Sequence, residues 1–293
     1  MKKDKASSTA LLIAASFAFL SRAQPDSSLV PPDSRRLGDW LLWNYSWFTR
    51  SVGACLDFRW FRALLHGIEG FALPGIVEHY ARRKHAIESL ARESGQLRQL
   101  VVLGAGFDTL SARLLTEFPD MKAWEIDHPA TQAWKIKGMA SSQRESPGLA
   151  FLPRDFSLPG PLTSDFLGPQ YRKELGTFWV AEGFLMYFPV QKVEEFFRFI
   201  HQNSAIGSRV AFTFMQPQDD GRVDFRRSSG GIRLWLACRS EPFAWGILQK
   251  DLPAFLFRLG FRLLDLSPQI TQEVSRLNVG EYLAVAEVSL SET

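Results

Sequence analysis

Residues 101–109, Val-Val-Leu-Gly-Ala-Gly-Phe-Asp-Thr, decide the fold of this chain. They predict a buried apolar strand that runs into a tight turn containing Gly104 and Gly106, and the turn opens a helix. A second short strand, over 122–126, ends at Asp127. In α/β proteins, glycines after the first strand let the backbone approach a nucleoside, and an acid after the second strand accepts hydrogen bonds from the ribose hydroxyls. The pattern therefore predicts a nucleoside-binding site.

The same turn distinguishes between classes of nucleoside ligand. A dinucleotide places its pyrophosphate at a bare helix N-terminus, and its site uses a third glycine. Here the third glycine is missing, and the carboxylate of Asp108 stands where it would repel phosphate oxygens. S-adenosylmethionine (SAM) contains adenosine without phosphate and carries a cationic sulfonium and an ammonium group. The residues therefore favour SAM over NAD or FAD. Asp108 can also act as a helix N-cap, and the two roles are compatible.

Composition limits the other possibilities. The 293 residues suffice for one large α/β domain, or for a domain with a cap, and 46% apolar residues supply a sizeable core. A formal charge of +3 is too small to indicate nucleic-acid binding. The two cysteines and five histidines show neither a disulfide framework nor metal-ligand spacing. We therefore expect neither a nucleic-acid partner nor a metal site.

The N-terminus has two interpretations. Basic residues within 2–5, an apolar run over 10–20 and a small-x-small sequence at 21–23 resemble a secretory signal. The alternative is an amphipathic first helix that begins near Ser8 or Thr9. The apolar run is too short to span a bilayer, and the rest of the chain resembles an intracellular enzyme rather than a disulfide-rich secreted domain. We therefore favour the helix, and a cytoplasmic protein without a membrane span.

Strands and helices are expected to alternate from residue 98 onward, a pattern typical of a parallel sheet covered on both faces. The five expected strands are 99–103, 122–126, 149–153, 177–181 and 209–214, and the helices between and after them are 109–117, 129–138, 190–203 and 252–259. Two further strands, 261–266 and 282–290, form a closing antiparallel pair. The chain therefore predicts an α/β fold with a seven-stranded, mostly parallel sheet, typical of methyltransferases rather than of a plain dinucleotide fold.

The N-terminal part is expected to be helical. The aromatic-rich stretch 39–72 favours packed helices rather than a ligand-binding box, and another helix is expected over 76–94. Residues 215–250 fit neither a strand nor a regular helix, and their position after the fifth strand predicts a lid over the site. We therefore divide the chain into an N-terminal helical cap, 1–95, and a core, 96–293, with the lid inserted in the core.

Ligands bind beyond the carboxyl ends of the strands in an open parallel sheet. Several candidate residues stand at the ends of the first four strands: Gly104 and Gly106, Asp127, Asp155 and Phe156, and Glu182. Carboxylates are rarely buried without partners, so acids after three successive strands indicate a cation-bearing ligand with ribose hydroxyls and an exocyclic amine. Any one of these acids could instead cap a helix.

Arg83 lies on the apolar side of the helix over 76–94. Such an arginine requires an anion, for which the SAM carboxylate is one candidate, or else it extends along its stem to water. His128, His201 and Lys135 are expected to be ordinary surface or capping residues.

Three motifs resemble the leucine carboxyl methyltransferase family, whose bacterial members include polyketide O-methyltransferases. They are residues 101–109, residues 125–132 (Glu-Ile-Asp-His-Pro-Ala-Thr-Gln) and residues 181–187 (Ala-Glu-Gly-Phe-Leu-Met-Tyr). The resemblance runs from about residue 74 to residue 266 and implies a Rossmann-like class I SAM-dependent methyltransferase with SAM as cofactor. It also implies the cofactor-binding residues: Arg83 at the SAM carboxylate, Gly104 and Gly106 at the methionine end, Asp127 at the ribose, Asp155 and Phe156 at the adenine, and Glu182 as the acid after the fourth strand.

The expected chemistry is methyl transfer to an oxygen, preferably a carboxylate, of a small molecule or a protein terminus. A carboxylic acid in water has a pKa of about 4 and is ionised at neutral pH, so it needs no general base. A phenol, with a pKa of about 10, would need one, and the candidates are His85, His128 and Tyr187. Two alternatives are a nucleotide-dependent oxidoreductase, which Asp108 disfavours, and a non-catalytic interaction protein of the same fold. The sequence leaves the catalytic residues, the acceptor and the oligomeric state open.

Overall fold

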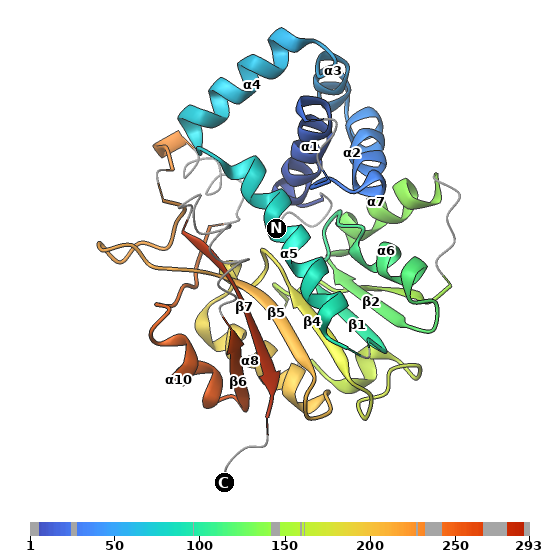
Figure 1. The fold of residues 1–293 in the computed structure, drawn as a ribbon, viewed down its shortest axis with the longest axis vertical. Coiled ribbons are helices and arrows are strands. Elements are labelled where there is room, and N and C mark those ends of the chain that lie inside the picture. Colours follow the sequence, from blue (N-terminus) through green and yellow to red (C-terminus); the bar gives the residue numbers. More distant parts are fainter. Residues whose placement is uncertain are drawn as a thin grey trace.

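Seven strands form one mixed sheet, with helices packed against it and four N-terminal helices beyond the edge where the parallel strands end (Figure 1). This computed structural model describes residues 6–24, 28–95, 97–141, 147–158, 160, 162–226, 228–231, 242–265 and 280–289. The fold described below refers to those residues.

The sheet has the predicted topology. Its strands are β1 (Gln99–Leu103), β2 (Lys122–Asp127), β3 (Leu149–Pro153), β4 (Thr177–Ala181), β5 (Arg209–Met215), β6 (Phe261–Asp265) and β7 (Glu281–Val288). Their order across the sheet is β3-β2-β1-β4-β5-β7-β6. Strands β1 to β5 run parallel, whereas β7 pairs antiparallel with both β5 and β6. The mostly parallel sheet with a closing antiparallel pair is therefore confirmed.

The central strands are buried on both faces. Every residue of β1 and β4 is buried, as expected for the continuous apolar runs of parallel strands. On one face, Val101 and Trp179 join a core that includes Phe196 and Phe197 of helix α8 (Val190–Gln202). On the other face, Leu100 packs in a core with residues of helices α5 (Ile76–Glu93) and α6 (Leu110–Glu117). The sheet is therefore a rigid support for the residues that follow its strands.

Five helices of the described chain pack close to the sheet. They are α5 (Ile76–Glu93), α6 (Leu110–Glu117), α7 (Pro129–Ala140), α8 (Val190–Gln202) and α10 (Leu252–Phe257), with short 3₁₀ helices at Ser164–Leu167 (η1) and Leu185–Tyr187 (η2). Helix α7 begins directly after β2, because Pro129 fixes its first turn and the Nδ1 atom of His128 accepts a hydrogen bond from the backbone N–H of Ala130. His128 is therefore a capping residue, as predicted.

The expected N-terminal helix is present as α1 (Ser8–Ala23), which begins where the hydroxyl of Ser7 accepts a hydrogen bond from the backbone N–H of Ala10. It is followed by α2 (Pro32–Asn44), α3 (Trp47–Cys55) and α4 (Arg59–Ala72). Helix α1 packs against α2 and α5 and buries Phe17 and Leu20. Within the described residues, no helix is both long and apolar enough to cross a bilayer.

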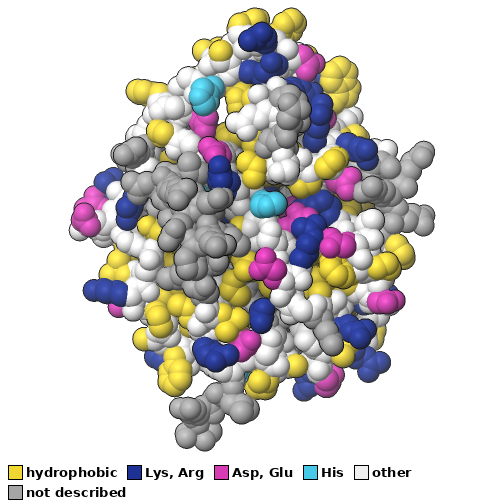
Figure 2. Space-filling view, in the orientation of Figure 1, with side chains coloured by type: hydrophobic (Ala, Val, Ile, Leu, Met, Phe, Trp, Pro, Cys, Tyr) yellow, Lys and Arg dark blue, Asp and Glu magenta, His cyan; other side chains and the backbone are white. Residues whose placement is uncertain are grey.

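Helices α3 and α4 do not pack as expected from their aromatic content. Neither helix buries any residue, and Trp47 and Phe71 are 80% and 84% exposed. On α4, exposed Trp60, Leu64, Ile68 and Phe71 recur at helical spacing, so a whole apolar stripe faces solvent. Figure 2 shows hydrophobic side chains on the surface at the upper end of the molecule, where Figure 1 places these helices. The prediction of helices was right, and the prediction of packing holds in part. Phe61 and Leu65 of α4 pack against Leu42 and Leu56, whereas the stripe stays exposed, because periodicity shows that a face is apolar but not what covers it.

Candidate functional site

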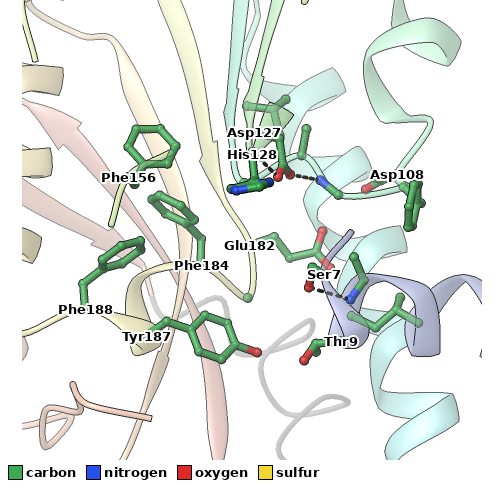
Figure 3. Close-up of a pocket in the computed structure, with 18 of the residues that line it drawn as sticks. Ser7, Thr9, Asp108, Asp127, His128, Phe156, Glu182, Phe184, Tyr187 and Phe188 are labelled. Atoms are coloured by element: carbon green, nitrogen blue, oxygen red, sulfur yellow. Dashed lines mark hydrogen bonds between the residues drawn. The ribbon is translucent and has the colours of Figure 1, made fainter. Parts of the chain in front are cut away.

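A cavity of about 690 Å³ lies at the carboxyl ends of the parallel strands (Figure 3). Its volume is in the range of small-molecule and cofactor sites. All seven predicted cofactor residues line it: Arg83, Gly104, Gly106, Asp127, Asp155, Phe156 and Glu182. The strand order β3-β2-β1-β4 arranges the residues that follow these strands in a row along one edge of the sheet.

The turn after β1 requires its glycines. Gly104 and Gly106 have φ angles of 68° and 50°, which other residues rarely adopt. A Cβ atom on Gly104 would also lie 2.4 Å from a ring carbon of Phe184. The glycines therefore allow the turn to pack closely beneath the cavity.

Asp127 connects this turn to the end of β2. One of its carboxylate oxygens accepts a hydrogen bond from the backbone N–H of Gly106, and the other accepts one from the backbone N–H of His128 (Figure 3). Burial raises the pKa of Asp127, while the two backbone hydrogen bonds act in the opposite direction. Each carboxylate oxygen has a second lone pair, so the side chain can still accept a ligand hydroxyl.

Asp155 and Phe156 form the end of the row at β3. Asp155 accepts hydrogen bonds from the backbone N–H and the hydroxyl of Ser157, at 2.9 and 2.6 Å. Burial opposes ionisation of Asp155, but these hydrogen bonds outweigh it and lower its pKa. The ring of Phe156 meets three other rings edge to face or tilted, those of Phe184, Phe188 and Phe196. The pair therefore combines a charged acceptor with an aromatic wall, as the binding of a flat, amine-bearing base requires.

At the β4 end of the row, Arg83 is buried between two glutamates. Its Nε donates to Glu182 Oε1 at 2.8 Å, and its Nη1 donates to both carboxylate oxygens of Glu281, at 2.7 and 2.6 Å. The side chain does not extend to water, since Arg83 is only 2% exposed. Burial alone would favour the neutral form of Arg83, but Glu281 and Glu182 raise its pKa, and Arg83 in turn helps lower the pKa of Glu281 to about 2.

Sequence reasoning missed Lys84 and Glu281. The Nζ atom of Lys84 lies 2.7 Å from Asp108 Oδ2 and 2.9 Å from Glu182 Oε2. Glu281 opens β7 and accepts a second contact from His79 Nε2, at 2.7 Å. An acid at the start of a largely apolar strand was the available signal for Glu281. Nothing local to Lys84 distinguishes it from a surface lysine.

Asp108 has the capping role considered from the sequence, and it also lines the cavity. Its Oδ1 accepts hydrogen bonds from the backbone N–H groups of Thr109 and Leu110, which caps α6. Its Oδ2 contacts Lys84 in the cavity wall. Burial would raise the pKa of Asp108, but Lys84 and then Arg113 lower it well below its usual range, so a negative charge is fixed beside the turn.

Lys135 is a buried residue, not the surface residue predicted. Its exposed fraction is 1%, and its Nζ atom lies 2.5 Å from Oε2 of the equally buried Glu125 on β2. His201 lies half-buried in the last turn of α8 with its ring against that of Phe261. Lys135 follows Asp127 by two helical turns on α7, so its pairing depends on how α7 packs on the sheet.

Helix α1 covers the cavity. Its Ala10, Ile13, Ala14 and Phe17 recur at helical spacing and line the cavity, and a Cβ atom on Gly106 would lie 3.4 Å from that of Ala10. Ser7 and Thr9 lie across the cavity from the aromatic residues that follow β4 (Figure 3). The sequence predicted this helix but not its place over the glycine turn.

The three candidate bases are placed differently. His85 is exposed and does not line the cavity, whereas His128 and Tyr187 do. His128 lies next to Asp127 and caps α7 with its Nδ1 atom, while Tyr187 lies near Thr9 of α1 (Figure 3). Part of the expected lid also reaches the cavity, through Pro242 and Ala244. Residues 227 and 232–241 of that lid lie outside the described residues. Within the part of the chain that the structure describes, no cluster of acids, cysteines and histidines could hold a metal ion.

Comparison with known proteins gives the family. A model of the family described as "Leucine carboxyl methyltransferase" matches residues 51–201, which is just over half of the chain. The chain belongs to the leucine carboxyl methyltransferase family. The resemblance inferred from the three sequence motifs is therefore confirmed.

Two mycobacterial relatives are named "Putative S-adenosyl-L-methionine-dependent methyltransferase". The one from Mycobacteroides abscessus is 33% identical over 135 residues, which cover 44% of this chain and 40% of that protein. The one from Mycobacterium ulcerans is 30% identical over 156 residues, covering 50% of this chain and 47% of the relative. The chain thus matches less than half the length of these relatives, and SAM is the cofactor that their names give.

Solved structures support the fold. A DUF574 family protein from Streptomyces avermitilis superimposes with a TM-score of 0.57 at 14% identity, covering 97% of this chain and 98% of that protein. A protein from Thermobifida fusca, whose structure is titled "putative methyltransferase", gives 0.54 at 17% identity, covering 87% and 94%. The architecture is that of the class I SAM-dependent methyltransferases, as predicted, with N-terminal helices added.

Proposed function

We propose that this protein is a SAM-dependent O-methyltransferase that acts on a carboxylate, or a hydroxyl group, of a small molecule or a peptide terminus. The observation that carries the proposal is the row of acids along one sheet edge, with a glycine turn in its middle and an aromatic wall at one end. Adenosine linked to a cationic amino-acid chain has complementary groups in the same order. A pyrophosphate would instead meet the fixed charge of Asp108.

Each residue of the row has a proposed role. Asp155 and Phe156 bind the adenine, and Asp127 binds the ribose hydroxyls. The backbone at Gly104 and Gly106 approaches the methionine chain. Arg83 and Glu182 lie at its charged end, where Arg83 positions Glu182 and adds positive charge near the carboxylate. SAM supplies the electrophilic methyl group, and the residues of the chain bind and orient it.

The acceptor is proposed to bind where α1 faces the segment after β4. That part of the cavity is lined by Ile13, Phe17, Tyr187 and Ala244, so it favours an acceptor with an apolar body, such as a polyketide acid. An ionised carboxylate needs no base, and holding its oxygen in line behind the methyl group can supply about 7–11 kcal/mol of the barrier. The apolar lining would also strip water from the nucleophile. For a phenolic acceptor, which needs a base, His128 and Tyr187 are the candidates that line the cavity.

We further propose that residues 1–95 act as a helical cap and residues 96–293 as the cofactor-binding core, with 215–250 as the lid. Because α1 forms a wall of the cavity, its loss as a cleaved signal would open the site. This supports retention of α1 and a cytoplasmic location.

Two measurements test the proposal. In thermal-shift and calorimetric titrations, SAM or S-adenosylhomocysteine (SAH) should bind, and NAD should not. Binding of NAD alone would overturn the proposal in favour of an oxidoreductase. Methyl-labelled SAM with a metabolite extract should then give a labelled product. Release of labelled methanol by mild alkali would identify a methyl ester, whereas an ether would resist. SAH binding without any labelled product would instead support a non-catalytic protein.

A further inference from the structure

The ammonium group of Lys84 occupies a position between two carboxylates in the cofactor cavity. It lies 2.7 Å from Asp108 Oδ2 and 2.9 Å from Glu182 Oε2, and all three side chains are largely buried. Asp108 follows the glycine turn of β1, and Glu182 follows β4. The three groups are therefore at the end of the row where the proposed cofactor has its amino-acid group.

That amino-acid group carries an α-ammonium and an α-carboxylate. The acids at this end of the cavity are Asp108 and Glu182, and Lys84 contacts both. Burial disfavours the charge on Lys84, but the two acids outweigh it and raise its pKa, so Lys84 is a cation at neutral pH. The α-ammonium of a ligand would therefore meet two acids that already pair with the Lys84 ammonium.

The neighbouring Arg83 is held elsewhere. All three nitrogens of its guanidinium contact Glu182 or Glu281, and the side chain is nearly inaccessible. The Lys84 ammonium has three hydrogens and two acid partners, and its stem is flexible. Of the two adjacent cations, Lys84 is therefore the one that can change partners at small cost.

We propose that Lys84 holds the place of the cofactor's α-ammonium in the free protein and exchanges it on binding. The ligand ammonium takes over the contacts with Asp108 and Glu182, and the displaced Lys84 pairs with the ligand carboxylate. A buried cation that loses its acids without gaining another anion is strongly destabilising. The exchange therefore makes binding depend on both charged groups of the ligand, and it excludes nucleosides that carry the ammonium alone.

This inference rests on the proposed cofactor. Three ligands distinguish a failure of the exchange from a failure of the proposed cofactor. SAH carries both charged groups, 5′-methylthioadenosine carries neither, and decarboxylated SAH carries the ammonium alone. 5′-Methylthioadenosine leaves Lys84 in place. Decarboxylated SAH displaces Lys84 without giving it an anion. The wild-type protein should bind decarboxylated SAH at least about tenfold more weakly than SAH.

The test is calorimetry of the three ligands with wild type, Lys84→Met, Lys84→Arg and Lys122→Met. Lys122 is exposed at the start of β2 and does not line the cavity, so Lys122→Met is a control that should change nothing. Lys84→Met should weaken SAH binding about tenfold or more, strengthen the binding of decarboxylated SAH, and change 5′-methylthioadenosine binding less than about twofold. Lys84→Arg should retain most of the SAH affinity.

Several results would overturn the exchange. In Lys84→Met, SAH affinity equal to wild type would remove Lys84 from recognition, and equal losses for SAH and 5′-methylthioadenosine would show a merely structural role. Weaker binding of decarboxylated SAH would show that Lys84 does not compete with the ligand ammonium. If the wild-type protein bound none of the three ligands, the proposed cofactor itself would fail. If the wild-type protein bound SAH and Lys84→Met bound all three ligands with wild-type affinity, only the exchange would be rejected, and the proposed cofactor would stand.

Discussion

The carboxylate of Asp127, at the end of β2, accepts a hydrogen bond from the backbone N–H of Gly106 in the turn after β1. Parallel pairing of the two strands places Leu103 beside Ile126, so the segments that follow them emerge together. The hydrogen bond fixes the glycine turn and orients the carboxylate toward the cavity. Asp127 therefore both builds the site and is available to bind a ligand.

Replacing Asp127 by Ala should weaken SAH binding by about 1–3 kcal/mol, because a hydrogen bond to the ribose and the support of Gly106 are both lost. Asp127→Asn retains one carbonyl acceptor and should lose less. Calorimetric titration of the two variants measures the difference. Unchanged affinity in Asp127→Ala would remove this residue from the site.

The size of the side chain at Ala10 of α1 should affect the affinity for SAH. Its Cβ faces the glycine turn across the cavity, so Ala10→Phe should fill the space above Gly106 and reduce SAH affinity about tenfold or more. Leu12, on the solvent side of the same helix, offers a control, since Leu12→Phe should bind SAH normally. Equal affinities for the two variants would mean that α1 does not limit the cofactor space.

The buried pair of Lys135 and Glu125 should be costly to break from one side. Lys135→Met leaves Glu125 buried without its cation, and we expect a loss of about 3–5 kcal/mol of unfolding free energy. Replacing both residues by Met removes both charges and should be markedly less destabilising than the single change. Urea denaturation of the single and double variants measures this. A double variant less stable than Lys135→Met would contradict the assignment.

Glu281 should make the protein sensitive to acid. Its pKa in the folded protein is about 2, below the ordinary value of 4.5, so its contribution to stability is present above about pH 4.5 and is lost as the pH falls toward 2. A shift of this size corresponds to about 3 kcal/mol. Glu281→Gln should be less stable than wild type at pH 7, because Arg83 loses one carboxylate, and its stability should fall less between pH 5 and pH 3. Denaturation curves at a series of pH values test this. Parallel pH profiles for the two proteins would exclude Glu281 as a source of the dependence.

The sheet could be predicted from the sequence almost residue by residue. Strands such as β1 and β4 are buried on both faces, so they appear as short apolar runs, and glycine or proline marks where they end. In a parallel sheet, all such ends lie at the same edge, so the strand pattern also predicted that Asp127, Asp155 and Glu182 would share a cavity. The structure confirms that placement.

Charge partners could not be predicted in the same way. Arg83 and Glu281 are 198 positions apart, and they meet only because β7 inserts beside β5 and α5 packs against the face of the sheet that includes β7. The pairing of Lys84 with Asp108 and Glu182 likewise requires three elements to converge. The sequence around Lys135 is typical of a surface lysine, and its pairing with Glu125 is decided by the packing of α7 on the sheet.

The sequence by itself determined which segments become strands and helices, the parallel character of the first five strands and the residues at the binding edge of the sheet. Hydrophobic periodicity and turn residues act over a few positions, and these features depend on nothing more. Only the tertiary structure decided that α1 covers the glycine turn, that α3 and α4 leave an apolar stripe exposed, and which cation pairs with which acid. Those outcomes depend on which surfaces and charges meet when distant segments pack, and a local pattern specifies that a face is apolar or a side chain charged without specifying its partner.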